Sequence, residues 1–362
     1  MKISLNREEY SKSADLLAVK EANISAAEIY IEYLTNHYND INFAKNSKDF
    51  YNSFLNCLEI DEKDEDYEGI NDICHIDQIT VLNKKDYEND AYYKLIKDIR
   101  AKEKDWQFIS CKYLPFEGFV SDELEINQTN YAEHTPLSYF EEEFIYPAVI
   151  ENDTIWMSII PHEINTMKEP IQNANGHVLV LGLGLGYYLF HISNKKEVKS
   201  IDVVEIDERI ISLFNKYLLN KFPNKTKINI INNDAIKYLK SNQKQYDYVF
   251  SDIWHNVGDG EMLYLKIKSF ENKYPNTKFD YWIETSILAM LRRQTLTVFS
   301  EQLEGLKEDA YLKAKNDNDL IINRIYFYLK NTEINNFDVL HNLLSDESLK
   351  IMAKNLLDSK DF

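Results

Sequence analysis

The sequence predicts an α/β fold in which helices cover both faces of a parallel sheet, giving three layers. The first observation is the run VLVLGLGLG at Val178–Gly186, which is apolar and holds three of the chain's nine glycines. The second is a regular alternation of short apolar runs and helical patterns after it. The third is that two of these runs end in an acid, Glu205 and Asp252. Such alternation is typical of βαβ units, whose ligands bind beyond the carboxyl ends of the strands.

The glycine turn follows the first strand of the predicted sheet. An apolar run that leads into glycines indicates a strand and a tight turn, and Tyr187–Asn194 has the pattern of a helix. Gly182, Gly184 and Gly186 let the backbone bend, or approach a ligand, with no Cβ in the way. The helix N-terminus adds unpaired N–H groups and the positive end of the helix dipole. The turn therefore predicts a site for a nucleotide-like ligand.

The other elements of the sheet follow in order. Strands are expected at Ser200–Glu205, Lys227–Asn232, Tyr248–Asp252 and Phe279–Ile283, and helices at Asp207–Phe222, Asp234–Ser241 and Met262–Lys273. Glu205 lies roughly 20 residues beyond the turn, where an α/β nucleotide-binding fold places its ribose-binding carboxylate.

The flanking regions predict a mixed N-terminal part and a helical C-terminal part. Residues 1–58 have helical patterns, and Ser25 with Glu28 predicts a helix start by a capping box. We further expect a helix at Tyr87–Lys104, a strand at Trp106–Tyr113 and a β-hairpin formed by Phe144–Ile150 and Thr154–Ile159. From Ser286 onward the pattern is helical. We therefore expect an accessory domain at 1–160, the sheet domain at 161–290 and a helical region at 291–362.

The glycine spacing G-x-G-x-G places the third glycine one residue earlier than the dinucleotide-binding fingerprint does. This spacing resembles motif I of class I methyltransferases that use S-adenosylmethionine (SAM). The resemblance implies a Rossmann-like SAM-binding domain with SAM as cofactor. In that family the glycines would lie beside the methionine part of SAM, Glu205 would bind the ribose, and Asp252 would stand at the reaction centre. The residues that the resemblance assigns to the cofactor are Gly182, Gly184, Gly186, Glu205, Ile206, Asp234, Ala235 and Asp252.

Within this superfamily, the block from VLVLGLGLG to YDYVFSD looks closer to the spermidine synthase branch. That branch has an aspartate between the second and third glycines, where this chain has Leu185. It also has a second acid shortly after the one matching Asp252, where this chain has Ile253, Trp254 and His255. Because polyamines are cations, these departures favour methyl transfer to a small molecule or a protein side chain. Aminopropyl transfer from decarboxylated SAM and a non-catalytic SAM-binding or scaffold role stay open as alternatives.

Several further residues are candidates for the chemistry and for the acceptor. Asp252 and His255 are the candidate catalytic residues: Asp252 because an acid at a strand end can orient the acceptor, and His255 because a histidine can act as a general base if its pKa is near neutral. Trp156 and Glu163 precede the glycine strand in a hairpin and a His-Glu element of the kind that the spermidine synthase branch also has. With Trp254 they are the candidate acceptor-binding residues, and Met157 and His162 are expected in the same wall.

The balance of charged residues indicates which classes of binding partner are unfavourable. The chain has 41 basic and 60 acidic side chains and a net charge of −19, which disfavours nucleic acid and anionic membranes. The absence of a long apolar run predicts a cytoplasmic protein with reduced cysteines. Cys57, Cys74 and Cys111 show no metal-binding spacing, so no metal is expected. The helical C-terminus could cover a sheet edge or make a homodimer contact.

Overall fold

The computed structural model describes residues 1–36, 44–57, 59–60, 63, 66–75, 78–151 and 154–358. The helices are α1 (Arg7–Asn36), α3 (Ser47–Cys57), α4 (Asp66–Cys74), α5 (Lys84–Glu88), α6 (Ala91–Ile96), α7 (Pro161–Thr166), α8 (Lys168–Asn173), α9 (Tyr187–Ser193), α10 (Glu208–Tyr217), α11 (Ala235–Ser241), α12 (Val257–Ser269), α13 (Glu284–Leu303), α14 (Asp317–Leu329), α15 (Phe337–Leu343) and α16 (Asp346–Leu356). The strands are β1 (Lys2–Ile3), β2 (Thr80–Val81), β3 (Ala101–Glu103), β4 (Trp106–Tyr113), β5 (Phe119–Val120), β6 (Glu125–Ile126), β7 (Glu133–His134), β8 (Leu137–Tyr139), β9 (Phe144–Glu151), β10 (Thr154–Ser158), β11 (Gly176–Leu181), β12 (Val198–Glu205), β13 (Ile228–Asn232), β14 (Tyr248–Ser251), β15 (Lys278–Tyr281) and β16 (Glu333–Ile334).

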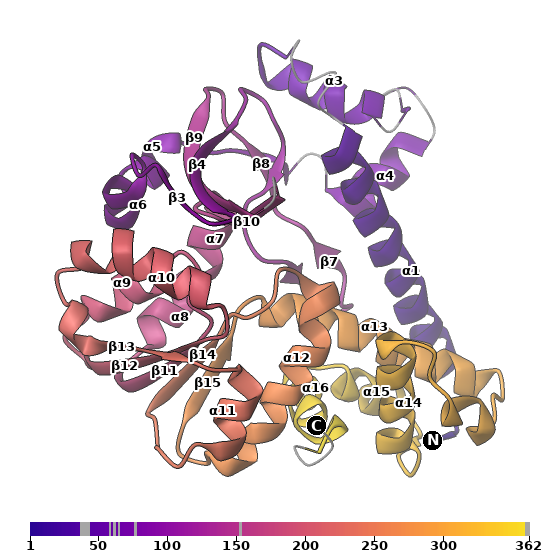
Figure 1. The fold of residues 1–362 in the computed structure, drawn as a ribbon. Helices are drawn as coiled ribbons and strands as arrows, with labels where there is room; N and C mark the ends of the chain where they lie inside the picture. The colour runs from indigo at the N-terminus through magenta and orange to yellow at the C-terminus, as the bar shows by residue number, and fades with distance from the viewer. Residues whose placement is uncertain are drawn as a thin grey trace.

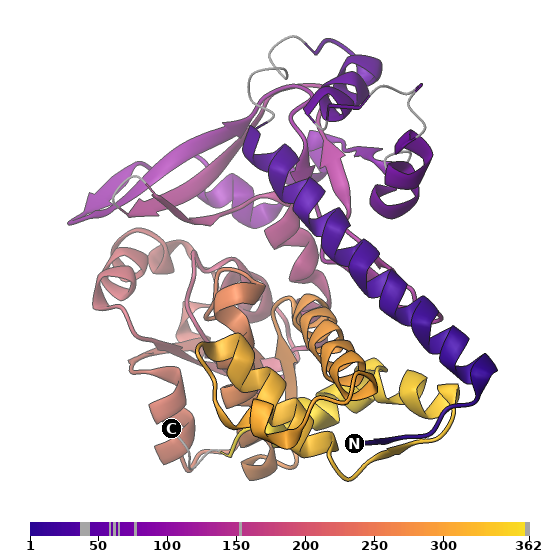
Figure 2. The same ribbon diagram turned by 90° about the vertical axis from the view of Figure 1, so that its right-hand side faces the viewer.

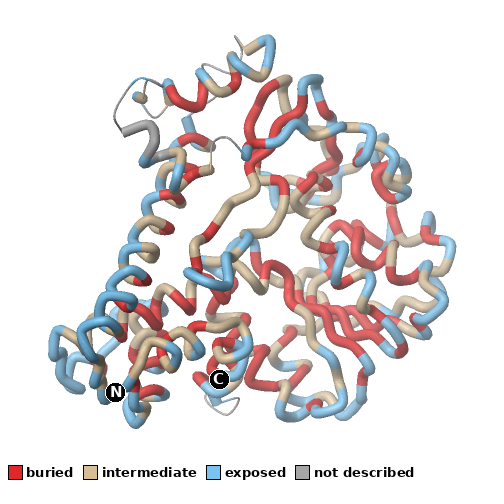
Figure 3. Tube along the Cα trace, turned by 180° about the vertical axis from the view of Figure 1, so that it is seen from behind, coloured by how far each residue is buried: buried red, intermediate tan, exposed pale blue. Residues whose placement is uncertain are grey.

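The central sheet confirms the predicted fold class. Its five strands are parallel in the order β13-β12-β11-β14-β15. Helices α9 and α10 cover one face, and α11 and α12 cover the other (Figure 1). The middle strands are buried along most of their length (Figure 3), which explains why their central residues are mostly apolar rather than alternating. The strand order changes direction beside β11, and in this architecture ligands bind at such a point.

A second sheet lies over the carboxyl ends of the central strands (Figure 1). It is antiparallel, in the order β10-β9-β4-β3. The predicted hairpin is β9 and β10; Asn152 and Asp153 of its expected turn lie outside the described residues. The prediction of one helix at Tyr87–Lys104 is wrong. Asp90 accepts hydrogen bonds from the N–H groups of Tyr92 and Tyr93 and so starts a new helix, α6, after which the chain turns into β3.

Helix α1 connects the two ends of the molecule. It runs without a break along one side, from the C-terminal helices to the region of α3 and α4 (Figure 2). The expected capping box at Ser25 and Glu28 is therefore wrong, since both lie inside the helix. Asn23 attaches α1 to the chain between β6 and β7: it donates to the carbonyl of Tyr131 (3.0 Å) and accepts from the N–H of Glu133 (3.0 Å).

The C-terminal region is helical, as predicted, apart from β16. Strand β16 pairs in parallel with β1, so the first residues of the chain lie beside its last part. Helix α16 packs against α12, the helix that follows β14 (Figure 1). Among the described residues no sixth strand joins the central sheet. None of the described helices has the length and apolar character needed to cross a membrane.

Candidate active site

A cavity of about 560 Å³ lies between the carboxyl ends of β11, β12 and β14 and strand β10 of the second sheet. This volume is in the range of small-molecule sites. Of the fourteen residues that the sequence analysis expected at the site, all but His162 line it: Trp156, Met157, Glu163, Gly182, Gly184, Gly186, Glu205, Ile206, Asp234, Ala235, Asp252, Trp254 and His255. Those of the central sheet come together because the carboxyl ends of parallel strands meet at one edge of a sheet, while Trp156 and Glu163 come from β10 and α7.

The three glycines of the turn lie in different surroundings. A Cβ added to Gly182 would lie 1.9 Å from the carbonyl oxygen of Asp252, and one added to Gly186 would lie 2.4 Å from the ring of Phe214. Packing alone therefore requires glycine at these two positions. A Cβ at Gly184 would meet only Met157 Sδ, at 3.7 Å, although the φ of +54° also favours glycine there. Gly184 is the glycine whose missing side chain leaves space in the cavity.

Glu205 stands at the end of β12 beside the glycine turn. Its Oε2 accepts from the N–H of Leu183 (3.1 Å) and its Oε1 from the N–H of Asp207 (2.8 Å). Burial raises the pKa of this carboxyl, while the backbone hydrogen bonds act in the opposite direction. The carboxylate thus holds the turn and retains lone pairs for a ligand's hydroxyl groups.

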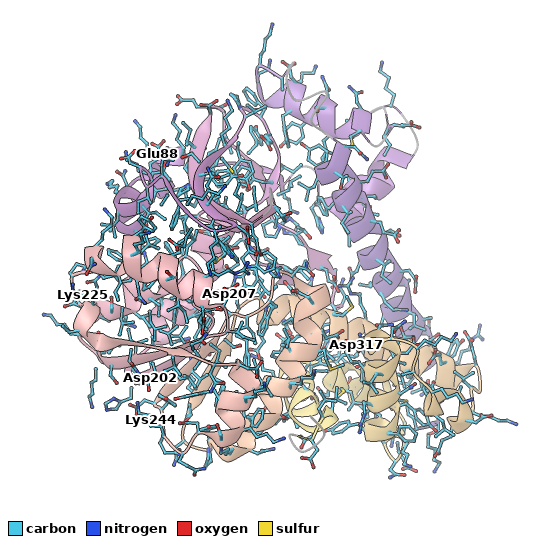
Figure 4. The ribbon with its side chains drawn as sticks, viewed as in Figure 1. Glu88, Asp202, Asp207, Lys225, Lys244 and Asp317 are labelled. Carbon is cyan, nitrogen blue, oxygen red and sulfur yellow. The ribbon has the colours of Figure 1, made fainter. Side chains whose placement is uncertain are left out.

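The residues next to Glu205 form the outer part of the same wall. Ile206 is 67% exposed, so its side chain is open to a flat apolar group. Asp234 caps α11 by accepting from the N–H of Lys237 (2.8 Å), and Ala235 is the first residue of that helix. Asp207, which sequence reasoning did not select, caps α10 and also lines the cavity; Figure 4 shows it well away from Asp202 and Lys244 of the same sheet domain.

Two buried carboxyl groups of the cavity have strongly raised pKa values. Burial raises the pKa of Glu163 to about 8, and the negative charge of Asp252 adds to the rise. Burial raises the pKa of Asp252 to about 7, with a further contribution from Glu205. Among the described residues, no cation pairs with either group. Without a ligand, both groups therefore hold protons near neutral pH.

The structure corrects the position expected for His162. It does not line the main cavity, although the adjacent Glu163 does; it lines a second cavity of about 210 Å³ beside α1 and α13. Burial lowers the pKa of His162 to about 4, so the imidazole is neutral at pH 7. Trp282, missed by the sequence analysis, lines the main cavity and contacts the ring of His162 at 5.9 Å between centroids. Its place directly after β15 was the available signal.

Aromatic side chains form the mouth of the cavity. Trp156 of β10 is 41% exposed, and its ring lies 4.0 Å from the ring of His255, centroid to centroid. Trp254 is buried and packs against Gly260 of α12. His255 is exposed and lies in the loop between β14 and α12. The contact between Trp156 and His255 joins the second sheet to this loop.

The charged residues of the cavity are almost all acidic. Among the described lining residues there are five acids and one histidine, and no lysine or arginine: the acids are Glu163, Glu205, Asp207, Asp234 and Asp252. A phosphate or carboxylate ligand would face repulsion here without a cationic side chain to offset it. A cation would be attracted, and would favour the ionised state of the carboxyl groups with raised pKa. The site therefore suits a positively charged small molecule.

Comparisons with known proteins find a similarity over the segment that contains most of the site. Residues 159–276 match the spermine/spermidine synthase domain. A polyamine aminopropyltransferase of Clostridium botulinum (strain Eklund 17B / Type B) is 26% identical over 163 residues, which are 43% of this chain and 56% of that protein. One from Methanocaldococcus jannaschii is 35% identical over 92 residues, 25% of this chain and 31% of that protein. The chain thus spans about half or less of the length of these relatives.

A solved structure of spermidine synthase from Thermotoga maritima is 15% identical, with a TM-score of 0.28, and the match covers 41% of this chain and 59% of that chain. With its five-stranded parallel sheet, the chain carries a fold like that of class I methyltransferases. Within that class, the match over residues 159–276 supports the spermidine synthase branch.

These findings correct the predicted activity. The prediction of a SAM-dependent methyltransferase is wrong, because the matched domain and the named relatives are aminopropyltransferases. The prediction of SAM itself as cofactor is wrong for the same reason, since spermidine synthases use decarboxylated SAM as their aminopropyl donor. The sequence analysis favoured methyl transfer because two acids of the spermidine synthase branch are missing from this chain. Glu163, which the sequence analysis expected in the wall of the site, contributes a carboxyl group to the same cavity as Asp252.

Proposed function

We propose that the chain transfers an aminopropyl group from decarboxylated SAM to an amine. The observation that carries this proposal is an acidic cavity, with no lysine or arginine among its described lining residues, inside the segment that matches the spermine/spermidine synthase domain. Decarboxylated SAM carries a sulfonium and an ammonium group and no carboxylate. SAM has a carboxylate, which would need a cationic or hydrogen-bonding partner here.

The roles of the cavity residues follow from their positions. Glu205 and Ile206 bind the nucleoside end, by hydrogen bonds to the ribose and by contact with the base. Gly184 leaves room for the sulfonium arm. Glu163 and Asp252 hold the cationic arm and the incoming amine. Their carboxylates supply the negative charge that Leu185, at the position of the family's aspartate, lacks. Leu185 is buried, and its carbonyl oxygen accepts a hydrogen bond from Tyr92.

The reaction itself asks little of the protein beyond placement. An amine nitrogen displaces the neutral thioether from the carbon next to the sulfonium, in line with the bond that breaks. Holding the two reactants in this geometry and keeping water out provides most of the acceleration. Carboxylates around the cations also keep the two positively charged reactants together, which water alone would not do.

The test is calorimetric titration of the full chain with decarboxylated SAM and with SAM, followed by a product assay with a series of linear diamines. We expect decarboxylated SAM to bind more tightly and Glu163→Gln to weaken it by about tenfold. Glu169→Gln, the same substitution at an exposed residue of α8, is the matched control and should leave the affinity for decarboxylated SAM unchanged. Tighter binding of SAM would overturn the proposal, and binding of neither would favour the non-catalytic scaffold.

A further inference from the structure

His255 and Asp259 form a pair at the mouth of the cavity. His255 Nδ1 lies 2.9 Å from Oδ2 of Asp259, which is in the first turn of α12. The same carboxylate accepts from the backbone N–H groups of His255 (3.1 Å) and Asn256 (2.9 Å). Burial raises the pKa of Asp259, but hydrogen bonds from His255 and Asn256 outweigh this effect and lower it. Asp259 is therefore an anion that fixes both the loop and the imidazole.

This arrangement determines which ring nitrogen is free. A carboxylate 2.9 Å from Nδ1 requires a proton on that nitrogen, so the lone pair of the neutral ring is on Nε2. None of the described residues forms a hydrogen bond with Nε2. Trp156 packs against the ring from β10, so the imidazole is held by α12 on one side and by the second sheet on the other. The ring lines the cavity, as Asp252 and Glu163 do.

The reaction needs a base for the proton of the acceptor. An amine acceptor arrives as an ammonium ion, which has no lone pair for attack. Tyr187 and Tyr188 line the cavity, as do the carboxyl groups of Asp252, Glu163, Glu205, Asp207 and Asp234. Taking a proton would neutralise the carboxylate that holds the cation. A neutral imidazole at the mouth can take the proton without removing negative charge from the cavity.

We propose that His255 Nε2 removes the proton from the acceptor's ammonium group and that Asp259 is its positioning residue. This inference rests on the proposed function. The ammonium gives its proton to Nε2, and the freed lone pair of nitrogen attacks the carbon attached to sulfur. A C–N bond forms as the C–S bond breaks, and the electron pair of that bond goes to sulfur, leaving a neutral thioether. The product is a secondary ammonium ion, and the imidazolium then releases its proton to water.

The experiment compares His255→Asn and Asp259→Asn with the wild-type chain, using the linear diamine that the wild type turns over best. His255→Asn should lower kcat by about 100-fold or more, which is the usual range for losing a general base. Its affinity for decarboxylated SAM should stay within about twofold. Asp259→Asn should lower kcat by about tenfold and leave the KM for the diamine within about twofold, because the imidazole loses the carboxylate that orients it.

A second Asp–His pair provides the matched control. His191 Nε2 lies 3.2 Å from Asp90 Oδ2, and His191 is not among the residues that line the cavity, so His191→Asn should leave kcat and KM unchanged. Asp259 still accepts from the N–H of Asn256 in His255→Asn, so this variant keeps its helix cap and tests the proposal even if Asp259→Asn unfolds. A wild-type kcat in His255→Asn would overturn this inference alone. A wild-type chain that does not bind decarboxylated SAM would overturn the proposed function as well.

Discussion

At the scale of single residues, the site separates into positions fixed by packing and positions open to a ligand. A Cβ at Gly182 would collide with Asp252 and one at Gly186 with Phe214, so packing in the fold requires glycine at both positions. Gly184 faces the cavity. Glu205 belongs to both groups, because it accepts a hydrogen bond from the turn and also lines the cavity. Substitutions in this turn should therefore change stability and binding in different proportions.

The glycine turn gives the first prediction. Gly184→Ala should fold, with a destabilisation of about 1 kcal/mol from a side chain at positive φ. It should weaken decarboxylated SAM by roughly tenfold, because the new methyl group occupies the ligand's space. Gly182→Ala is the contrast, since its Cβ would meet backbone at 1.9 Å, and it should lower the melting temperature far more. Calorimetry and thermal melts check both; equal donor affinity in Gly184→Ala and wild type would contradict this assignment.

Glu205 gives the second prediction. Glu205→Ala should weaken decarboxylated SAM by roughly 10- to 100-fold, because hydrogen bonds to a charged group contribute about 1.5–3 kcal/mol. The variant should also be less stable, since the N–H groups of Leu183 and Asp207 lose their acceptor. Glu205→Gln keeps an amide oxygen and should lose less in both titration and melting. Normal donor affinity in the alanine variant would remove Glu205 from the site.

At the scale of elements, the sequence predicts the central sheet well and the N-terminal region less well. Strands β11, β12 and β14 are buried on both faces and are therefore mostly apolar, a pattern that can be recognised without tertiary information. Asp90 and Ser25 show the limit of this reasoning. Asp90 starts a new helix directly after Asn89 has capped the end of the one before it, while Ser25 lies on the exposed face of a long helix whose course depends on contacts at its two ends.

The site was predictable in its residues and not in its chemistry. Strand ends in order, with the hairpin and His-Glu element before them, selected thirteen residues that the structure brings to one cavity. The sequence does not show which way a helix faces, so His162 and Glu163 were expected in one wall, although they line different cavities. The proposal of decarboxylated SAM as the donor depends on the total charge around the cavity, which only the folded arrangement reveals.

Helix α1 gives the third prediction. Asn23→Ala should destabilise the protein by about 2 kcal/mol, because the buried carbonyl of Tyr131 and the N–H of Glu133 lose their partner. Ser25→Ala, two residues along the same helix and exposed, should change stability by less than about 0.5 kcal/mol. Urea unfolding measures both. A Ser25→Ala effect as large as that of Asn23→Ala would restore a capping role for Ser25.

At the scale of the whole molecule, the two sheets enclose an acidic cavity in an acidic protein. The net charge of −19 lowers the free energy of any cation near the surface, and the cavity concentrates this effect where Glu163, Asp252 and Glu205 lie close enough to shift one another's pKa values. Without a ligand, the repulsion between these carboxyl groups is reduced because Glu163 and Asp252 retain protons. Binding of a cation and release of these protons are therefore one linked equilibrium.

This linkage gives the last prediction. The ionised carboxyl groups bind the cation, and their pKa values are about 8 for Glu163 and about 7 for Asp252. At pH 6 both are largely protonated, so a donor must displace protons; at pH 8 Asp252 is mostly ionised. The Kd for decarboxylated SAM should therefore fall with rising pH, by about tenfold between pH 6 and 8 from Asp252 alone.

Calorimetry in two buffers of different ionisation enthalpy measures the protons released on binding. The wild type should release protons near pH 7, and Glu163→Gln should release fewer, because one of the two coupled groups no longer titrates. The same substitution at Glu169, which is exposed on α8, should leave the number unchanged. A Kd that is flat from pH 6 to 8 would mean that Glu163 and Asp252 do not face the donor's charge, and the cationic end of the ligand would then have to lie elsewhere in the cavity.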